Sequence, residues 1–429
     1  MLPWPQCARS GPGASVAEVS DEDDVDGETV ELAPDRHVAG GDALARDEQG
    51  RVVFVRGALP GETVTVEITE TKKDFARGHV VDVLDSSVHR VEPPCPQRRR
   101  GCGGCDWQHI DPSAQLDAKV AIVTDALRRT AHLDGPVVSA AGSVPATGYR
   151  TTVRVVGTHQ GTAGFRHERS HETVDAAGCL VAHERLVELL GSMRVSPGLE
   201  VTLRCSTTTT ERLALWDPRA GEVTGLPDDV AVGADAVVHQ GIGGVDLRVS
   251  AMSFFQSGPD AARLLVDSVS RAAPEMASAR RVVDLYAGVG LFAAAAVPAG
   301  IPVTLVESAL SAVADARVNV PRGEIVTSEV GRWRPPARRR RSGGPTADVV
   351  IADPPRSGLG GPGVAAVAST GAATVVLVSC DPAAAARDAS LLGRRGYRHV
   401  GTEVLDLFPH THHVETVTRF TLDPAGVVA

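Results

Sequence analysis

The stretch Arg281-Val-Val-Asp-Leu-Tyr-Ala-Gly-Val-Gly290 predicts the fold of the C-terminal part of the chain. Its apolar residues predict a short buried strand, and the two glycines that end it allow a ligand to approach the backbone where Cβ atoms would block it. The next apolar run, Val303–Val306, leads into Glu307, and a carboxylate at this place suits the two hydroxyls of a ribose. From about residue 253 onward, strand-like runs alternate with alanine-rich helical segments, so we expect a parallel α/β sheet. A lone glycine-rich loop is a weak signal, and Gly288–Ala293 also fits a dinucleotide-binding fold.

Three polar motifs follow this stretch. Asp353-Pro-Pro-Arg356 ends the apolar run Val349–Ala352, and Ser379-Cys380-Asp381-Pro382 ends the run Thr374–Val378. Open α/β sheets bind ligands at the carboxyl ends of their strands, so we expect these motifs at one edge. His413-Val-Glu415 comes near the C-terminus. A thiol, a loop acid and a late carboxylate at one edge indicate covalent catalysis, and a hydride-transfer enzyme would explain neither of the first two motifs.

Each of these residues also has an ordinary structural interpretation. Free cysteine is most often a small buried core residue, which is the alternative for Cys380. Asp353 precedes a proline and suits a helix N-cap. Glu415 lies in the strand-like run Val414–Val417 and suits a solvent-facing position. The order of the motifs, rather than any single residue, favours catalysis.

The cysteines predict a second site. Three of the seven, Cys95, Cys102 and Cys105, fall within eleven residues. In a reducing compartment this spacing favours metal binding over a disulfide framework, and Cys179 is the best candidate for the fourth ligand. Four cysteines suit tetrahedral zinc or a cubane iron–sulfur cluster. The alternative is a glycine-rich turn with incidental cysteines.

Composition and charge divide the chain of 429 residues. The net charge of −10 argues against a uniformly basic nucleic-acid binder, but acidic residues concentrate near the N-terminus, and we expect residues 1–26 to be a disordered acidic tail. Short strand-like runs, one of them at residues 79–83, predict a small β-barrel over residues 27–87. In the β-rich central domain with the cysteine cluster (88–250), Asp111-Pro112 predicts the start of a helix and residues 231–239 predict a strand. The α/β domain (251–429) completes the expected organisation. Because we find neither a run that could span a bilayer nor a secretory signal, we expect a cytoplasmic protein with reduced thiols.

The motifs in their order resemble those of the RNA 5-methyluridine methyltransferase family. The signposts, which span about residues 28 to 420, are a TRAM-like barrel, the cysteine-rich loop, Phe254–Gly258, Asp284–Gly290, Asp353–Arg356, Ser379–Pro382 and Asp406–Glu415. The resemblance implies a class I S-adenosylmethionine-dependent methyltransferase fold (Rossmann-like) at the C-terminus, behind an OB-like barrel. Two positions depart from the pattern, because Gly258 and Leu291 stand where many relatives carry asparagine.

The resemblance also implies an activity, namely methylation of uridine carbon 5 in RNA. Cys380 would be the nucleophile that attacks carbon 6, and Glu415 would be the base that removes the carbon 5 proton. The positions that would line the S-adenosylmethionine and uracil pocket are Gln256, Tyr286, Glu307 and Asp353. The positions that would hold a [4Fe–4S] cluster are Cys95, Cys102, Cys105 and Cys179. Zinc stays open as an alternative, because the first gap has six residues where many members have five.

The expected partner is RNA. Ribosomal RNA (23S) is favoured by the TRAM-like barrel, and transfer RNA is the alternative; a membrane or an obligate protein partner is not expected, and we expect a monomer. Candidate RNA contacts are the loop Lys72–Arg77 and the basic runs Arg98–Arg100 and Arg338–Arg341. Two other functions remain open: an RNA-binding protein without turnover, and a methyltransferase acting on an exocyclic nitrogen or on protein. The latter needs an aromatic residue where this chain has Arg356, and no covalent thiol.

Overall fold

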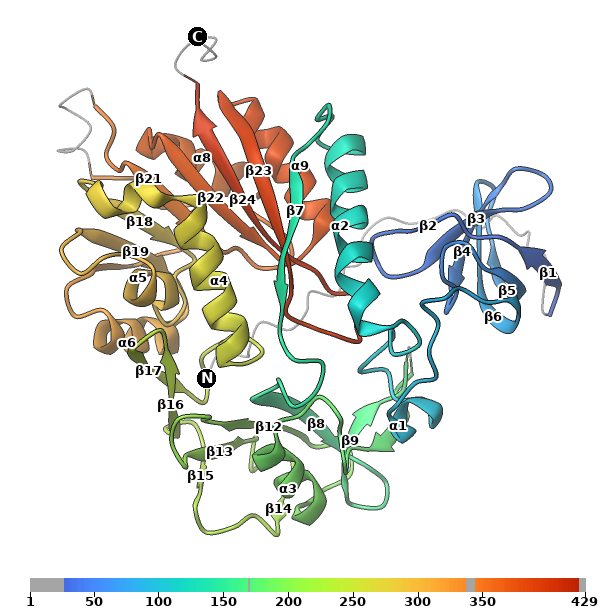
Figure 1. Cartoon of the computed structure of the whole chain (residues 1–429). Helices are drawn as coiled ribbons and strands as arrows, with labels where there is room; N and C mark the ends of the chain where they lie inside the picture. The colour runs from blue at the N-terminus through green and yellow to red at the C-terminus, as the bar shows by residue number, and fades with distance from the viewer. Residues whose placement is uncertain (1–26, 169, 337–343, 424–429) are drawn as a thin grey trace, which may run out of the picture.

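The computed structural model describes residues 27–168, 170–336 and 344–423 (Figure 1). The expected acidic tail, residues 1–26, and the basic run at positions 338–341 lie outside the described residues. None of the helices in the described ranges is both long and apolar enough to cross a membrane.

The N-terminal part is a six-stranded sheet with strand order β1-β5-β6-β4-β3-β2. Alternation of buried and partly exposed residues along β5 places Val64, Val66 and Ile68 in its core, as expected of a sheet with one packed face. Its strands are β1 (Thr29–Leu32), β2 (Arg36–His37), β3 (Ala43–Arg46), β4 (Val52–Arg56), β5 (Thr63–Thr71) and β6 (Phe75–Asp85). The strand expected at 79–83 is longer at both ends, because β6 pairs with both β4 and β5.

The cysteine-rich segment leads from this sheet into a long helix. It contains the short helix α1 (Pro96–Arg99) and ends at α2 (Pro112–Arg129), followed by strand β7 (Val138–Ser143). Helix α2 begins where the sequence predicts, because the Asp111 side chain accepts a hydrogen bond from the Ser113 N–H at 2.8 Å and Pro112 occupies the first turn.

The central part is a second six-stranded sheet, order β10-β9-β8-β12-β13-β15, covered by helix α3 (Glu184–Ser192). Its strands are β8 (Thr152–Gly157), β9 (Ala163–Arg166), β10 (Thr173–Asp175), β12 (Glu200–Cys205), β13 (Arg212–Leu215) and β15 (Val230–Val232), with β11 (Arg194–Val195) and β14 (Val223–Thr224) forming a small separate sheet. The single strand expected over residues 231–239 is wrong. The chain turns at Gly233, whose φ is 103°, and β16 (Val237–Ile242) then pairs with β17 (Val245–Ser250) instead.

The largest sheet has eight strands in the order β20-β19-β18-β21-β22-β24-β23-β7. The predicted parallel core is present, since β18 pairs in parallel with β19 and β21, and β21 with β22. The last strand, β24, runs antiparallel to β22. The strands are β18 (Val282–Leu285), β19 (Val303–Glu307), β20 (Glu324–Thr327), β21 (Val349–Ala352), β22 (Thr374–Ser379), β23 (Tyr397–Asp406) and β24 (Glu415–Leu422).

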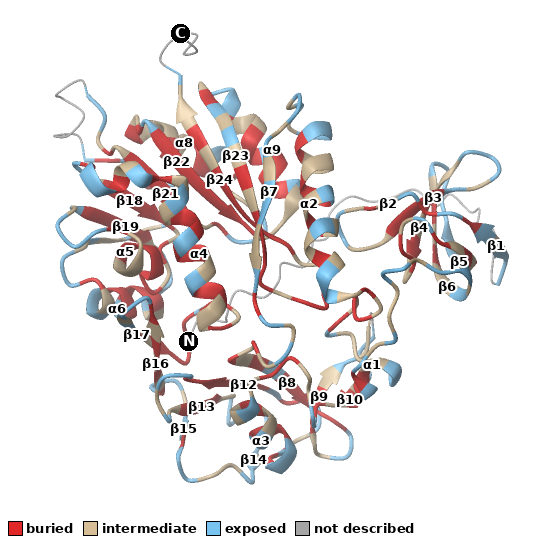
Figure 2. Cartoon of the chain, in the orientation of Figure 1, coloured by how far each residue is buried: buried red, intermediate tan, exposed pale blue. Residues whose placement is uncertain are grey.

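Helices cover both faces of this sheet (Figures 1 and 2). Helices α4 (Pro259–Ala272), α5 (Leu291–Ala295) and α6 (Leu310–Asn319) pack on one face, with the 3₁₀ turn η1 (Pro274–Ser278). Helices α8 (Gly360–Thr370) and α9 (Pro382–Gly393) pack on the other. Because both faces are covered, every residue of β18, β21 and β22 is buried. Strand β7 pairs with β23 at the edge of this sheet, and helix α2 packs on its face. Both elements fall inside the range 88–250 expected for the central domain.

Candidate active site and cysteine cavity

Strand pairing places the predicted nucleophile next to the predicted base. Ser379 pairs with Thr416 across β22 and β24, and the Thr416 hydroxyl donates to the Ser379 carbonyl at 3.0 Å. Cys380 directly follows the first of these residues and Glu415 directly precedes the second. Because the two strands are antiparallel, the end of β22 and the start of β24 lie at the same edge.

Burial governs the protonation of both groups. It raises the pKa of the Cys380 thiol to about 12, with further upward contributions from the charges of Glu415 and Asp353. Glu415 is 4% exposed, and burial together with the charge of Asp353 raises its pKa well above the ordinary value, while Arg356 acts in the opposite direction. The thiol and two carboxylates therefore lie within electrostatic reach of one another in a site largely closed to water.

Asp353 belongs to this group rather than to a helix end. The Gln256 side chain donates to the Asp353 carboxylate at 3.4 Å, which brings together two predicted pocket residues 97 positions apart. The N-cap interpretation of Asp353 is wrong, because α8 begins only at Gly360. The first N–H groups of that helix are satisfied by Asp388 of α9, which accepts from Leu359 at 2.6 Å and from Gly360 at 3.1 Å.

Tyr286 and Glu307 line a cavity of about 300 Å³ beside this edge. Tyr286 has a φ of 59°, a backbone conformation that costs energy for a bulky residue and is found mostly at functional sites. The Glu307 carboxylate accepts hydrogen bonds from the N–H groups of Gly288 at 2.9 Å and Ala309 at 2.7 Å. It therefore fixes both the glycine-rich loop and the loop that leads into helix α6. Ser328 and Glu329 also line this cavity, and neither was predicted from the sequence. Their place after the run Ile325–Thr327 was the only feature of the sequence that could have indicated them.

Asp284 lies beneath the glycine-rich loop and is completely buried. One carboxylate oxygen accepts from the Ala293 N–H at 3.2 Å, while Oδ1 has no partner. Burial raises the pKa of this carboxyl to about 8, with smaller contributions from Asp353 and Glu307. An unpartnered buried acceptor is rare in native structures and marks a place where a donor is missing.

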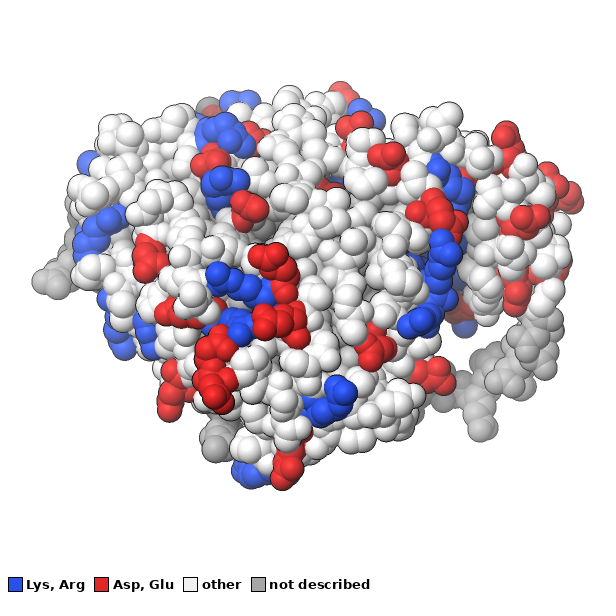
Figure 3. Space-filling model, turned by 60° about the horizontal axis from the view of Figure 1, so that its bottom comes forward, with Lys and Arg blue, Asp and Glu red and all other residues white. Residues whose placement is uncertain are grey.

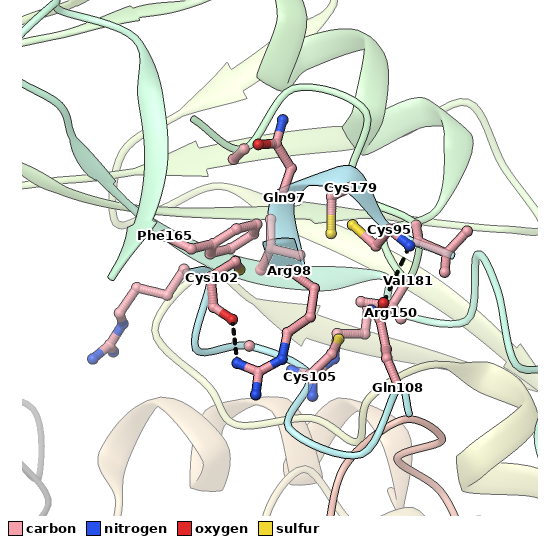
Figure 4. A pocket seen from close by; sticks show the side chains of 15 residues that line it. Cys95, Gln97, Arg98, Cys102, Cys105, Gln108, Arg150, Phe165, Cys179 and Val181 are labelled. Carbon is pink, nitrogen blue, oxygen red and sulfur yellow. Dashed lines mark hydrogen bonds between the residues drawn. The ribbon is translucent and has the colours of Figure 1, made fainter. Parts of the chain in front are cut away.

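The four predicted cysteine ligands line one cavity of about 230 Å³, together with Arg98 and Arg150 (Figure 4). Gln108 accepts from the Cys95 N–H at 3.2 Å, and Arg98 donates to the Cys102 carbonyl at 3.1 Å, which holds the loop around the cavity. Burial raises the pKa of Cys105 to about 12, and the charges of Cys179 and Cys102 act in the same direction. Across the described ranges, no three His, Cys, Asp or Glu side chains are arranged to hold a metal ion.

The eight-stranded sheet, with ligand-sized space at the carboxyl ends of its strands, defines a class I S-adenosylmethionine-dependent methyltransferase fold behind an N-terminal β domain. The crystal structure of a Pyrococcus abyssi tRNA (uracil-54, C5)-methyltransferase, solved with S-adenosyl-L-homocysteine, has the same fold: the TM-score is 0.67 and the identity 24%, covering 91% of this chain and 99% of that one. The TRAM domain model matches residues 29–81, which are most of the first sheet.

Relatives of this chain in bacteria identify the family. Proteins called uncharacterised RNA methyltransferases from Streptomyces avermitilis and Streptomyces coelicolor are each 37% identical to this chain; the matches cover 92% of it and 98% and 93% of those proteins. A relative of the same description from Gloeobacter violaceus is 31% identical over 91% of the chain. The chain therefore belongs to this family of RNA methyltransferases, and it is an enzyme.

Proposed function

We propose that this RNA methyltransferase transfers the methyl group of S-adenosylmethionine to carbon 5 of a uridine through a covalent adduct on Cys380. The observation that carries the proposal is the placement of a buried thiol and a buried carboxylate beside one paired position of two neighbouring strands. A methyltransferase acting on an exocyclic nitrogen has no use for either group in this place.

The chemistry of uracil requires both groups. Carbon 5 is a poor nucleophile until the Cys380 thiolate adds to carbon 6, which moves the ring electrons into an enolate. The enolate carbon then takes the methyl group that S-adenosylmethionine supplies. Glu415 removes the carbon 5 proton, the C–H electron pair re-forms the carbon 5–carbon 6 double bond, and the C–S bond breaks to return the thiolate. Burial of Glu415 suits the last step, because a carboxylate with a raised pKa is a stronger base.

The charge distribution supports a cationic methyl donor. Asp284, Asp353 and Glu415 all have raised pKa values because burial disfavours their ionised forms. S-adenosylmethionine carries a sulfonium and an ammonium group, so its binding would favour those ionised forms, and the unpartnered Oδ1 of Asp284 offers an acceptor to a bound donor. Tyr286 and Glu307 would hold the nucleoside part in the neighbouring cavity.

The cysteine cavity supports a [4Fe–4S] cluster rather than zinc. Cysteine thiolates bind either group, so the identity of the four ligands alone does not choose between them. The four cysteines share one cavity of about 230 Å³ with other lining residues, and this volume fits a group larger than one ion. The residues that would hold it are Cys95, Cys102, Cys105 and Cys179, and its role would be structural, since the proposed reaction transfers no electrons.

The proposed RNA substrate must be bound by individual basic side chains rather than by a uniformly basic surface. On the face drawn in Figure 3, Lys and Arg side chains are interspersed with Asp and Glu side chains, in keeping with the net charge of −10. Within the run Arg98–Arg100, Arg98 pairs with Glu168 at 3.0 Å and Arg99 with Glu92 at 2.7 Å. The buried position of Cys380 requires the target base to leave its stack, which costs least in loops and single strands. We favour ribosomal RNA because of the TRAM domain, and transfer RNA is the second candidate.

The experiment is transfer of tritium-labelled methyl groups to RNA from a strain that lacks this gene, using wild-type protein and Cys380→Ala. Digestion to nucleosides identifies the product, and fractionation identifies the RNA. We expect label in 5-methyluridine with wild type alone. Label in another nucleoside would refute the proposed position, and equal label with Cys380→Ala would refute the covalent route.

A further inference from the structure

The cysteine-rich segment lies directly against the loop that leads to Glu415. Asp106, the residue after Cys105, accepts two hydrogen bonds from His412, one from ring Nδ1 at 2.6 Å and one from the backbone N–H at 3.2 Å. The next residue, Trp107, donates its backbone N–H to the His410 carbonyl at 2.9 Å. These contacts join positions more than 300 residues apart in sequence and are continuous with the wall of the cysteine cavity.

A second bridge starts from another wall of the same cavity. The Arg150 guanidinium lines the cavity and lies 5.6 Å from the centre of the Phe408 ring, within the range of a cation–π contact. The neighbouring Tyr149 donates its hydroxyl to the Pro409 carbonyl at 3.2 Å. Two separate segments that line the cysteine cavity thus hold successive residues of one loop, 408–412.

This loop needs external support and ends at the catalytic edge. His410 has a φ of 66°, which is unfavourable for a residue with a side chain, so contacts from outside must maintain its conformation. The Phe408 ring packs edge-on against His413, with 5.9 Å between ring centres, and Arg356 donates to the His413 ring at 3.3 Å. Glu415 follows two residues later, at the start of β24.

We propose that the walls of the cysteine cavity position Glu415, with Asp106 and Arg150 as positioning residues that act on it through the 408–412 loop. The inference rests on the proposed function and adds a task for the cysteine site: a filled cavity keeps residues 105–107 and 149–150 in the places from which they hold the loop. Cys380 follows a different strand, β22, so the contacts bear on proton removal from carbon 5 and not on the attack at carbon 6.

This division predicts which intermediate accumulates. Displacement of Glu415 slows removal of the carbon 5 proton, whereas formation of the C–S bond and methyl transfer proceed. The methylated uridine then stays bound to Cys380, as a protein–RNA adduct that survives denaturation. General-base catalysis contributes 10²–10⁴-fold, and a displaced base loses part of this, so we expect about tenfold more adduct per enzyme at steady state.

The experiment compares Asp106→Ala with Asp106→Asn, which keeps an acceptor oxygen for the His412 N–H. His412→Ala removes the ring hydrogen bond from the loop side, keeps the backbone one, and leaves the cysteine segment untouched. Asp125→Ala, which removes an exposed helical ion pair with Arg129 at 2.8 Å, is the matched control. Each protein is assayed for iron and sulfide content, thermal unfolding, methylated nucleoside, and adduct on denaturing gels with labelled RNA. RNA containing 5-fluorouridine, which has no carbon 5 proton to remove, reports the earlier steps alone.

We expect both alanine variants to accumulate adduct on uridine RNA and to form the 5-fluorouridine adduct at the wild-type rate. The Asn variant and Asp125→Ala should resemble wild type. The double variant Asp106→Ala/His412→Ala should be no worse than Asp106→Ala, because that variant has already lost both hydrogen bonds. Slower product formation without extra adduct, in alanine variants that retain iron and sulfide, would overturn the inference. A wild-type protein that makes no 5-methyluridine would instead overturn the proposed function.

Discussion

Replacing Asp284 with asparagine is expected to stabilise the cofactor-free protein at alkaline pH while weakening its binding of the methyl donor. Asparagine has the shape of a protonated aspartic acid and keeps an acceptor for the Ala293 N–H. It removes a carboxyl that is completely buried and whose Oδ1 has no partner. The wild-type chain is thus destabilised wherever this group has to ionise without a bound cation.

The size of the effect follows from the pKa. Burial raises the pKa of Asp284 from 3.8 to about 8, so between these values the folded state holds a proton that the unfolded state has lost. The free energy of unfolding then falls as the pH rises, by about 1.4 kcal/mol per pH unit, and this decline ends above pH 8. Between pH 4.5 and 8.5 the variant should therefore gain up to about 5 kcal/mol relative to wild type.

Urea unfolding at pH 4.5 and 8.5 measures the gain, and calorimetric titration with S-adenosylhomocysteine measures the loss of affinity. The comparison at two pH values cancels effects of the substitution that do not depend on protonation. Other carboxyls with raised pKa values, such as Asp353, are present in both proteins, so their contributions to the difference in stability cancel to first order. An equal difference in stability at both pH values would refute the reasoning, and so would unchanged affinity for the ligand.

Three further predictions concern the thiols and the buried ion pair. Because burial raises the pKa of Cys380 to about 12, its alkylation by iodoacetamide should be slow at pH 7 and faster as the pH rises through 10. A cationic cofactor analogue should accelerate the reaction at pH 7. Reaction of Cys380 at the rate of a free thiol would contradict this prediction. Lys119→Met should lower the free energy of unfolding by about 3–5 kcal/mol in urea melts. Lys119 and Asp406 form a buried ion pair at 2.6 Å, and the substitution leaves the Asp406 charge without its partner. A loss below about 1 kcal/mol would contradict this prediction. Cys179→Ser should purify with less iron than wild type, and an unchanged iron content would remove Cys179 from the proposed ligands.

Local sequence patterns predicted the elements whose causes are local. Asp111-Pro112 marks the start of α2 because a capping side chain and a proline at the first turn act within a few residues. The apolar runs Val349–Ala352 and Thr374–Val378 form buried strands, since a sheet covered on both faces needs uninterrupted apolar side chains. The expected strand at 231–239 failed at Gly233, whose positive φ breaks the extended backbone.

Long-range partners could not be predicted in this way. Hydrophobic periodicity gives the type of an element and not its neighbour. Nothing therefore indicated that Val138 of β7 pairs with Thr402 of β23, 264 positions later, or that Lys119 meets Asp406 across 287 positions. The same limit applies to Asp106, which had no signal beyond its place after Cys105. The motif order, by contrast, pointed to one edge for Asp353 and Cys380, because the carboxyl ends of parallel strands meet there. Glu415 lies at the same edge because β24 starts there and runs antiparallel to β22.

A variant that lacks the proposed base should trap the covalent adduct on Cys380. Glu415→Gln protein, incubated with S-adenosylmethionine and RNA from a strain that lacks the gene, is digested with protease and nuclease and mapped by mass spectrometry. We expect a methylated uridine joined to the peptide that contains Cys380. Methylated RNA with no adduct, or an adduct on another thiol such as Cys205, would contradict it.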